Sequence, residues 1–450
     1  MNEEHFFMVS WGKSISRIDP SAYHPDCEAA RDAISKMPFD VHPLQTQAKF
    51  EKRVPGGQTY VGLEHISSGT GVACEFADAE KMAAGVGFLS GDVLFPKLRP
   101  YLNKVWLADR DGMCSSEFHV LTARTALTPE FLAIFLRSSF IVRQTSRLMT
   151  GTTLPRLQTD DIRRLLIPTP PQEIQSKISA VWNSGLAKRA ASIAEADALL
   201  VSIDDYLLTE LGITLPPEPE NTIDKRMFRA EASDLGGWRF DPRVHQYDFN
   251  LVSATHPNAK LGTICAINPK TVFRGLTDKD AVSFVPMDTI SDRLGIIEKP
   301  KTRVLTENVG YTFFREGDLL WAKITPCMEN GKSAVAESLC NGFGYGSTEY
   351  HVLRSPDGSL DMGYLHALLR MKRVRKAAVR FFTGASGHQR VDADFLRTLE
   401  LPVPPLGVQK KLAEEARLRV AKAVQLEEEA NAELEQAKRD IEAILLGEAV

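Results

Sequence analysis

Gly91–Lys97 has the sequence GDVLFPK, and GDLLWAK follows 226 residues later at Gly317–Lys323. A second segment recurs at nearly the same interval, because SSEFHVL at Ser115–Leu121 returns as STEYHVL at Ser347–Leu353. Segments that recur in the same order at a nearly constant interval indicate a duplicated unit.

Four further pairs of segments extend this repeat toward both ends of the chain. Their interval grows only from 222 to 234 residues, as a few loop insertions would produce. The pairs are Arg17–Pro20 with Arg239–Pro242, Tyr60–Ser67 with Phe284–Ser291, Thr150-Gly151 with Thr383-Gly384, and Ile167–Pro171 with Leu401–Pro405. We therefore expect two copies of one unit.

Each copy is expected to mix helices and strands. Short runs of β-branched and aromatic residues, broken by Gly and Pro, indicate strands and turns. Apolar residues at helical spacing predict helices near 127–147 and 360–382. A Pro-Pro pair then precedes a long helix, at about 172–211 in the first copy and 405–446 in the second. The expected fold class is α+β, with two tandem, pseudo-symmetric α/β domains, each followed by a long helix.

The second long helix carries a seven-residue repeat, and the first carries a shorter seam from Ile193 to Leu207. Heptads of this kind favour coiled-coil packing, in which alanine lets the helix axes approach closely. The alternative is that each helix lies on its own domain. At ~1.5 Å per residue, 40 residues span ~60 Å, which suits a spacer. In the second helix the seam positions hold Ala416, Ala423, Ala430, Ala437 and Ile444 in one row, and Val420, Leu434 and Ile441 in the other, which Glu427 interrupts.

These patterns divide the chain into five expected parts. A first domain at 1–170 and its helix at 171–211 are followed by a linker at 212–237. A second domain at 238–404 and its helix at 405–450 complete the chain. The linker is inferred from the aperiodic sequence PPEPEN that begins at Pro216, which is typical of a surface connection.

Composition excludes several classes of protein. The 450 residues are 43% hydrophobic and 25% charged, which is ordinary for a globular protein and argues against disorder. No apolar run reaches the ~18 residues of a membrane span, and the start MNEEHFF lacks the basic region of a secretory signal. The six cysteines form no CxxC pair and no cluster with histidines. We therefore expect reduced thiols, a cytoplasmic protein, no membrane contact, and no metal or other cofactor.

The formal net charge of −4 averages over regions of opposite charge. Residues 131–159 and 362–391 contain no Asp or Glu, but hold four and seven basic residues, whereas both long helices are acidic. An acid-free basic stretch suits a polyanion, because Lys and Arg at phosphates release counterions. The alternative is an ordinary solvated helix face.

A polar loop follows each basic stretch, at Gly151–Arg156 (GTTLPR) and Gly384–Arg390 (GASGHQR). Arginine can bind guanine O6 and N7, glutamine can bind adenine N6 and N7, and the threonine methyl can contact a thymine methyl. The loop residues differ between the copies while the surrounding segments repeat. A reader of two different half-sites would have this pattern.

No catalytic motif is complete. The GKS segments at Gly12 and Gly331 lack the first glycine of a P-loop, and no GxGxxG, GxSxG, HExxH or Asn/Asp-Pro-Pro-aromatic motif occurs. A nuclease site could be built from Asp318, Glu329 and Lys332, but the spacing of the last two exceeds the usual Glu-x-Lys by one residue. We expect that the chain is not an enzyme.

Two acid–histidine pairs also occur, Glu117 with His119 and Glu349 with His351. Alternation along a strand puts both members of each pair on one face, where they could hydrogen-bond. Half-buried polar residues of a strand need no catalytic role.

Over residues 15–446 the duplicated unit resembles the specificity subunit of type I restriction-modification systems. The segments that carry the resemblance are Gly91–Lys104, Gly317–Pro326, Ser347–His351 and the two Ile/Leu-Pro-x-Pro-Pro segments with Gln172 or Gln409 nearby. The first loop departs from the second by being shorter and less polar.

The resemblance implies that each α/β domain reads one half of a split DNA sequence, largely through the major groove. It implies that the two long helices pack as an antiparallel coiled coil and set the unread gap. The implied partners are double-stranded DNA, two N6-adenine methyltransferase subunits and a motor-nuclease subunit; the chain itself would catalyse nothing. An assembly like that of type IIB systems stays open.

The expected DNA contacts combine this resemblance with the charge pattern. Residues expected to bind the backbone are Lys97, Arg99, Lys104, Arg143, Arg147, Lys323, Lys372, Arg373, Lys376 and Arg380. Residues expected to read bases are Thr152, Thr153, Arg156, Ser386, His388, Gln389 and Arg390. A different class of function, a coiled-coil scaffold that binds proteins, would show a much weaker dependence on salt.

Overall fold

The computed structural model describes residues 23–54, 56, 59–74, 76–78, 85–151, 153–218, 222, 249–273, 275–305, 310–385 and 387–448. The chain forms two compact units: unit 1 is Met1–Ser192 with Glu428–Val450, and unit 2 is Ile193–Glu427. Most of the predicted linker, and the repeated segments at Arg17 and Arg239, lie outside the described residues.

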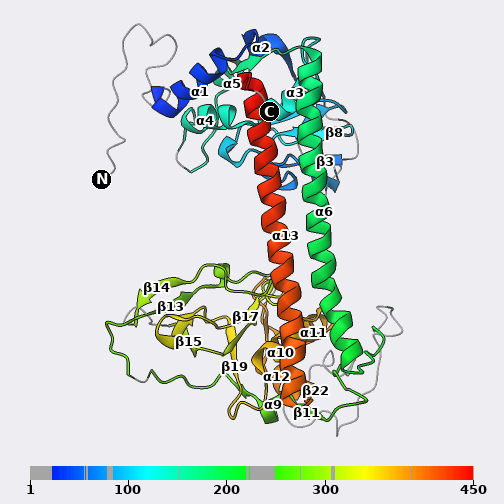
Figure 1. The fold of residues 1–450 in the computed structure, drawn as a ribbon, viewed down its shortest axis with the longest axis vertical. Coiled ribbons are helices and arrows are strands. Elements are labelled where there is room, and N and C mark those ends of the chain that lie inside the picture. Colours follow the sequence, from blue (N-terminus) through cyan, green and yellow to red (C-terminus); the bar gives the residue numbers. More distant parts are fainter. Residues whose placement is uncertain are drawn as a thin grey trace. The chain divides into compact units, whose positions relative to one another are not determined.

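Unit 1 contains two four-stranded sheets with helices beside them (Figure 1). One sheet has the order β2-β9-β6-β7 and the other β4-β3-β8-β5, in which only β3 and β8 pair in parallel. The strands are β2 (Ala48–Glu51), β3 (Thr59–Val61), β4 (Ala77–Asp78), β5 (Val86–Phe88), β6 (Val93–Pro96), β7 (Trp106–Leu107), β8 (Gly112–Cys114) and β9 (Phe118–Ala123), and a third pair joins β1 (Val41–Pro43) to β10 (Leu166–Pro168). The helices are α1 (Pro25–Ser35), α2 (Leu44–Gln47), α3 (Pro129–Leu136), α4 (Ser139–Arg147) and α5 (Thr159–Arg163).

Unit 2 repeats this topology, which confirms the predicted pseudo-symmetry. Its sheets have the orders β12-β19-β16-β17 and β14-β13-β18-β15, again with one parallel pair, β13 with β18. The strands are β11 (Asn258–Lys260), β12 (Ala266–Ile267), β13 (Ala281–Val285), β14 (Lys301–Val304), β15 (Thr312–Arg315), β16 (Leu319–Ala322), β17 (Ser333–Val335), β18 (Phe343–Gly346), β19 (Tyr350–Arg354), β20 (Phe382–Thr383), β21 (Arg390–Val391) and β22 (Glu400–Pro402). The helices are α9 (Leu261–Ile264), α10 (Met362–Arg370), α11 (Lys372–Ala378) and α12 (Ala393–Thr398).

The repeated Gly-Asp segment has the same structural role in both units. Gly91 and Gly317 have φ angles of 88° and 79°, a conformation that glycine adopts without steric cost. The next residue, Asp92 or Asp318, is buried and accepts the backbone N–H of the residue three positions earlier at 2.8 Å. Every residue of β6 and β16, the inner strands that follow, is buried. The motif therefore turns the chain into the core of each unit.

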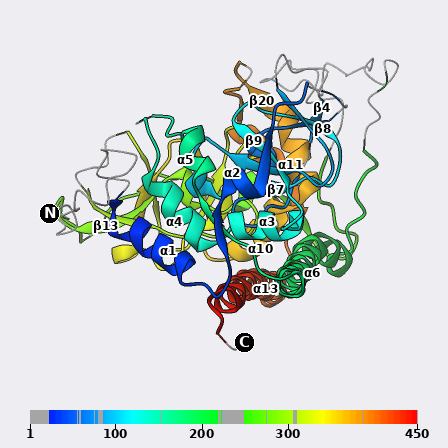
Figure 2. The same cartoon turned by 90° about the horizontal axis from the view of Figure 1, so that it is seen from above.

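The long helices α6 (Gln172–Glu210) and α13 (Leu406–Leu446) lie side by side (Figures 1 and 2). Within unit 1, a Cβ built on Gly185 would lie 2.8 Å from the Cβ of Ala437. Within unit 2, Ala196 packs with Ala423, and Arg419 donates to the carbonyl oxygen of Ser202 at 2.9 Å. As the residue numbers increase along α6, the numbers of their partners on α13 decrease, so the two helices pack antiparallel. Small residues lie where the helices approach most closely.

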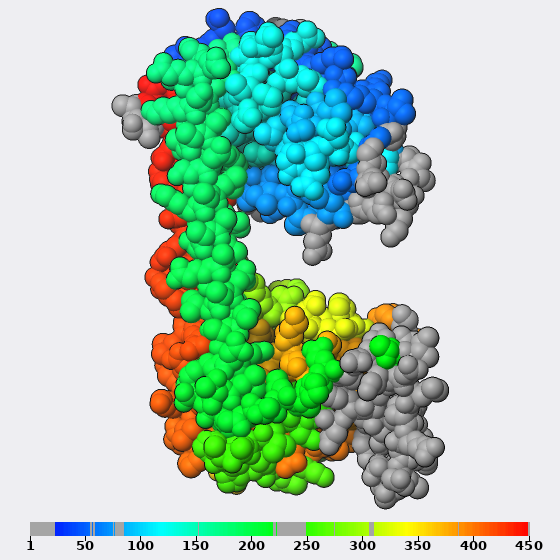
Figure 3. Space-filling view, turned by 90° about the vertical axis from the view of Figure 1, so that its right-hand side faces the viewer, coloured from blue at the N-terminus to red at the C-terminus, as the bar shows by residue number. Residues whose placement is uncertain are grey.

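Glu427, which interrupts the predicted seam, has a specific partner. Arg293 forms an ion pair with Glu427 and a second one with Asp197 of α6 at 2.7 Å. A charged position in the seam is therefore tolerated because a guanidinium from the adjoining domain neutralises it. The outward face of α6 is exposed along its length (Figure 3). No helix among the described residues is both long and apolar enough to cross a membrane.

A buried glutamine fixes the start of each long helix. Gln409 accepts the N–H of Asp361 at 2.8 Å and donates to the carbonyls of Ser359 and Pro404 at 3.2 and 2.8 Å. Gln175 makes the same set of three bonds in unit 1. The residue equivalent to Gln409 is therefore Gln175. The sequence had led us to expect Gln172, but Gln172 is the exposed first residue of α6.

Replacing Gln409 with leucine is expected to destabilise unit 2 by about 2–3 kcal/mol. The substitution keeps the volume but leaves one N–H and two carbonyl groups without their partner in the interior. Urea denaturation followed by hydrogen exchange of α10 measures the effect. Gln175→Leu should match it in unit 1, whereas Gln172→Leu at an exposed position should change stability by less than about 0.5 kcal/mol. Equal stability of Q409L and Q172L would contradict the assignment.

Candidate nucleic-acid interface

The two predicted polar loops are hairpins of the same design. In hairpin 1 (Thr150–Arg156), the N–H groups and carbonyls of Thr150 and Arg156 bond to each other, both at 2.9 Å. In hairpin 2 (Thr383–Arg390), Thr383 pairs with Arg390 between β20 and β21. A glycine follows each threonine, and Gly151 and Gly384 have φ angles of 94° and 104°. Each hairpin therefore ends in an arginine whose backbone is fixed by the turn.

Two other segments hold each hairpin on its domain through backbone hydrogen bonds. The N–H of Lys97 bonds to the carbonyl of Glu117 at 2.8 Å, and the carbonyl of Lys97 accepts the N–H of Leu157 at 2.9 Å. In unit 2 the equivalent bonds join Lys323 to Glu349 at 2.9 Å and to Val391 at 2.8 Å. Both Gly-Asp motifs therefore lead, through the inner strand, to a lysine that lies against the hairpin.

The hairpin arginine forms a paired hydrogen bond with a glutamate in both units. Nε and Nη2 of Arg156 donate to the carboxylate of Glu117 at 3.0 and 2.7 Å. Nε and Nη2 of Arg390 donate to Glu349 at 2.8 and 2.7 Å. Bidentate pairs of this kind fix the plane of the guanidinium as well as its position. We refer to each as an arginine–glutamate fork.

The forks keep both glutamates charged at neutral pH. The hydrogen bonds from Arg156 lower the pKa of Glu117, and those from Arg390 lower the pKa of Glu349, against a smaller opposing effect of burial. The charges of Lys97 and Lys323 act in the same direction. Because these pKa values lie below the ordinary value, the forks are intact above it and are lost only as the pH falls through the lowered pKa.

The expected glutamate–histidine hydrogen bonds are replaced by these forks. His119 lies 3.3 Å from the hydroxyl of Thr159 through Nε2, and Nε2 of His351 lies 3.0 Å from the carbonyl of Val391. Burial lowers the pKa of His119 to about 4 and also lowers that of His351. A charged guanidinium is the stronger partner for a carboxylate, so the histidines take neutral partners and are uncharged at neutral pH.

The remaining hairpin residues lie at the surface where the structure describes them. Thr153 and His388 are exposed, and Gln389 is partly exposed, with its carbonyl accepting the N–H of Thr325 at 2.9 Å. Two residues that we expected to read bases, Thr152 and Ser386, lie outside the described residues.

The lysines and arginines beside hairpin 1 have different surroundings. Arg99 is exposed and has a left-handed backbone with φ of 48°. Its N–H bonds to the carbonyl of Pro155 in the hairpin at 2.9 Å. Lys104 instead donates through Nζ to the carbonyl of Leu63 at 2.8 Å, so its ammonium already has a partner within the domain.

Several basic side chains of the helices have acidic partners that the sequence does not reveal. Arg143 is exposed on α4, but Arg147 pairs with Asp26 at 3.1 Å. On α11, the side chains of Lys376 and Arg373 pair with Glu218. The backbone N–H of Lys372 donates to the carboxylate of Asp204 at 3.0 Å, which brings a second acid to this helix. Arg380 is partly buried in the 3-10 turn Val379–Phe381. The acids come from distant segments, so a stretch that is acid-free in sequence is not acid-free in the fold.

Two arginines of these stretches are structural. Arg137 is 7% exposed and donates to the carbonyl of Val105 at 3.0 Å, and burial lowers its pKa to about 10. Arg370 is its counterpart and donates to the carbonyls of Asp292 and Arg293 at 3.0 and 2.8 Å. A glycine with positive φ, Gly71 or Gly295, leaves room for each guanidinium. These arginines join a helix end to a loop, and their guanidinium groups are already bound to backbone carbonyls.

The residues considered for a nuclease site have structural partners. Asp318 is buried in a bidentate ion pair with Arg354, and Lys332 donates to the carbonyls of Met287 and Ile290. Glu329 accepts a hydrogen bond from Thr325. Among the described residues, no group of three or more His, Cys, Asp and Glu side chains could hold a metal ion.

Sequence reasoning missed the role of Glu117 and Glu349, which we had considered only as partners of histidine. The available signal was the recurrence of Ser-x-Glu-aromatic-His together with a hairpin that ends in arginine in each copy. Nothing in the local sequence links a glutamate to an arginine 39 or 41 residues away.

Comparison with known proteins gives one family. The family model for the type I restriction modification DNA specificity domain matches residues 91–182 and 258–436. The chain is 31% identical to the type I restriction enzyme EcoEI specificity subunit of Escherichia coli over 186 residues, which are 41% of this chain and 31% of that protein. It is 33% identical to the EcoAI specificity subunit of the same organism over the same lengths. The matched part therefore spans less than a third of either relative.

A solved structure on complex assembly and conformational transition of the type I R-M system contains a chain with a similar fold. The TM-score is 0.52 at 20% sequence identity, and the match covers 91% of this chain and 97% of that one. At this level of identity the likeness concerns the fold alone.

Proposed function

The chain belongs to the family of type I restriction-modification DNA specificity proteins, and from this premise we propose that it reads a bipartite DNA target. Residues 1–170 read one half-site and residues 238–404 read the other. The observation that supports this proposal most is that hairpins 1 and 2 have the same backbone pairing of threonine with arginine and the same arginine–glutamate fork. They differ in the residues between that threonine and arginine. A shared frame with different reading residues suits two different half-sites.

The helices at 171–211 and 405–450 set the unread gap in this proposal, and 212–237 is the linker between the halves. Two N6-adenine methyltransferase subunits dock on the helices and domains, and a motor-nuclease subunit joins for cleavage. The chain positions these enzymes on DNA and performs no chemistry itself. A chromosomal DNA target places the protein in the cytoplasm.

The experiment that tests this function is a map of N6-methyladenine across the genome of a host that expresses the chain with its neighbouring methyltransferase subunit. The expected result is one split motif with a fixed gap between two half-sites. A stable complex that methylates no motif, or a continuous motif without a gap, would contradict the proposal.

Salt dependence distinguishes a DNA reader from a protein scaffold. The affinity of the chain for a duplex that contains its motif should fall linearly on logarithmic axes as salt rises, because phosphate contacts release counterions. Lys323→Ala should reduce the slope by about 0.9, the value for one phosphate contact. The measurement is fluorescence anisotropy over a series of salt concentrations. The matched control is Lys410→Ala on α13, and equal slopes for both variants would argue against a phosphate contact at Lys323.

A further inference from the structure

The forks use only one edge of each guanidinium. A guanidinium has five N–H donors, and in hairpin 2 the bonds to Glu349 take Nε–H and one N–H of Nη2. Nη1 of Arg390 gives a third bond, to the carbonyl of His388 at 3.1 Å. Contacts with described residues thus account for three donors. The two others are one N–H on each terminal nitrogen.

The edge of the guanidinium between Nη1 and Nη2 is not used by Glu349, and it presents one N–H from each nitrogen as a second, outer pair of donors. The side chain of Arg390 is 44% exposed and that of Glu349 is 20% exposed, and the values for Arg156 and Glu117 are 45% and 26%. The glutamate is thus the half-buried member of each pair, and the arginine is the member that solvent or a ligand can reach. The outer pair of donors matches the two acceptors O6 and N7 that guanine presents in the major groove.

Building on the function proposed above, we propose that Glu117 and Glu349 are positioning residues that hold Arg156 and Arg390 edge-on, so that each hairpin reads a guanine. The glutamate occupies the inner edge of the guanidinium and leaves the outer edge for the base. The recurrence of the same fork in both units, on the same backbone frame, makes this one device used twice.

A phosphate is the less suitable partner for the same arginine. The adjacent carboxylate neutralises most of the guanidinium charge, which weakens attraction to an anion. It leaves the hydrogen-bonding geometry intact, and geometry is what distinguishes guanine from other bases. Lys97 and Lys323 lie beside the hairpins and form no such fork with a carboxylate of the described residues, so they suit the phosphates better.

The fork is not needed to hold the fold together. Exposed ion pairs contribute at most about 1 kcal/mol to stability, and each fork is one such pair at the surface of its unit. Replacement of the glutamate should therefore leave the melting temperature within about 2 °C of the wild-type value, while the preference for guanine changes. A purely structural role would show the reverse.

The test uses the full chain co-expressed with its methyltransferase subunit, and reads out the base preference at every motif position from the methylation map. The wild-type motif should contain a guanine in each half. Glu349→Gln keeps the size of the side chain but not its charge, and should lower the preference for one guanine roughly 10-fold. Arg390→Lys keeps the charge but not the paired donors, and should lower it roughly 10- to 100-fold. The other half-site should be unchanged.

Glu117→Gln and Arg156→Lys are the matched variants for the first hairpin and should affect only the opposite half-site. The inference is overturned if the fork variants leave every base preference unchanged, or if they weaken methylation of all sequences alike, as loss of a phosphate contact would. In both cases the wild-type split motif remains, so the proposed function stands. If wild type gives no split motif, the proposed function fails and this inference fails with it.

Discussion

Asp318→Ala is expected to lower the free energy of unfolding of unit 2 by about 3–5 kcal/mol, the cost of leaving a buried charge without its partner. Asp318 is 1% exposed and binds Nε and Nη2 of Arg354 at 2.7 and 2.6 Å. It also accepts the N–H of Arg315 at 2.8 Å. The substitution would leave two groups without their partner: the guanidinium of Arg354, whose side chain is 13% exposed, and the backbone N–H of Arg315 at the end of β15.

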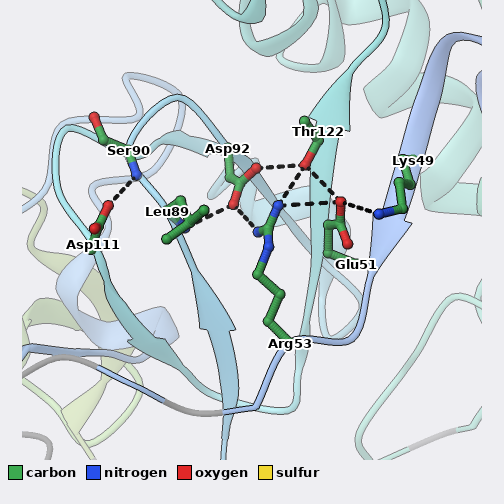
Figure 4. Close-up of polar contacts among 8 residues, drawn as sticks. All are labelled: Lys49, Glu51, Arg53, Leu89, Ser90, Asp92, Asp111 and Thr122. Atoms are coloured by element: carbon green, nitrogen blue, oxygen red, sulfur yellow. Dashed lines mark hydrogen bonds and ion pairs between the residues drawn. The ribbon is translucent and has the colours of Figure 1, made fainter.

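The equivalent substitution in unit 1, Asp92→Ala, should cost less, about 1–3 kcal/mol. Arg53 binds Asp92 but also lies 3.2 Å from Glu51, and its side chain is 27% exposed (Figure 4). The guanidinium therefore keeps one carboxylate and some solvent when Asp92 is lost. Thr122, at the position that Arg354 takes in unit 2, also donates to Asp92, at 2.7 Å. The two units thus bury the equivalent aspartate with arginines from different segments: Arg53 follows β2, and Arg354 is the last residue of β19.

Hydrogen exchange of the strand amides measures both effects unit by unit. D318A should increase exchange in β16 and β19, and D92A should increase it less in β6 and β9. Arg354→Met in the D318A background should restore part of the loss, because it removes the stranded charge. If D318A were as stable as wild type, the structural role assigned to Asp318 would be wrong, and a functional role of its carboxylate would have to be tested.

The sequence predicted most of the fold because its signals are local or repeated. The first long helix was expected at 172–211 and spans Gln172–Glu210, since Pro170-Pro171 marks its start and Gly212, with φ of 59°, follows its end. Alanines at every seventh position likewise predicted the buried seam of α13. The order of strands within each sheet was not accessible, because pairing depends on contacts between distant segments.

Only the part of the candidate site that depends on local sequence was predicted, because contacts between distant segments leave no local signal. Polar loops that end in Arg156 and Arg390 are visible in the sequence, but the glutamate that pairs with each arginine comes from the turn just before a distant strand, β9 or β19. Charge counts along the chain also treated Arg137 and Arg370 as available cations, whereas folding buries them against backbone carbonyls. Burial and cross-chain partners decide whether a basic residue can bind DNA, and neither follows from local composition.

Ala423→Glu is expected to open the helix pair of unit 2, at a cost of about 3–5 kcal/mol, because it places a charge and extra volume in a packed seam. Ala423 is fully buried and packs with Ala196 and Leu426. Ala421, two residues earlier on the same helix, is exposed, so Ala421→Glu makes the same chemical change and should alter stability by less than about 0.5 kcal/mol.

Hydrogen exchange of residues 193–210 and 406–427 separates the two variants. A423E should speed exchange in both helices, and A421E in neither. If the helices dock the methyltransferase as proposed, A423E should also lower methylation of the whole split motif. The fork variants, in contrast, should change one half-site alone. A charge buried between packed helices cannot be accommodated without separating them. Equal exchange in A423E and A421E would therefore show that the alanine seam does not hold the helices together.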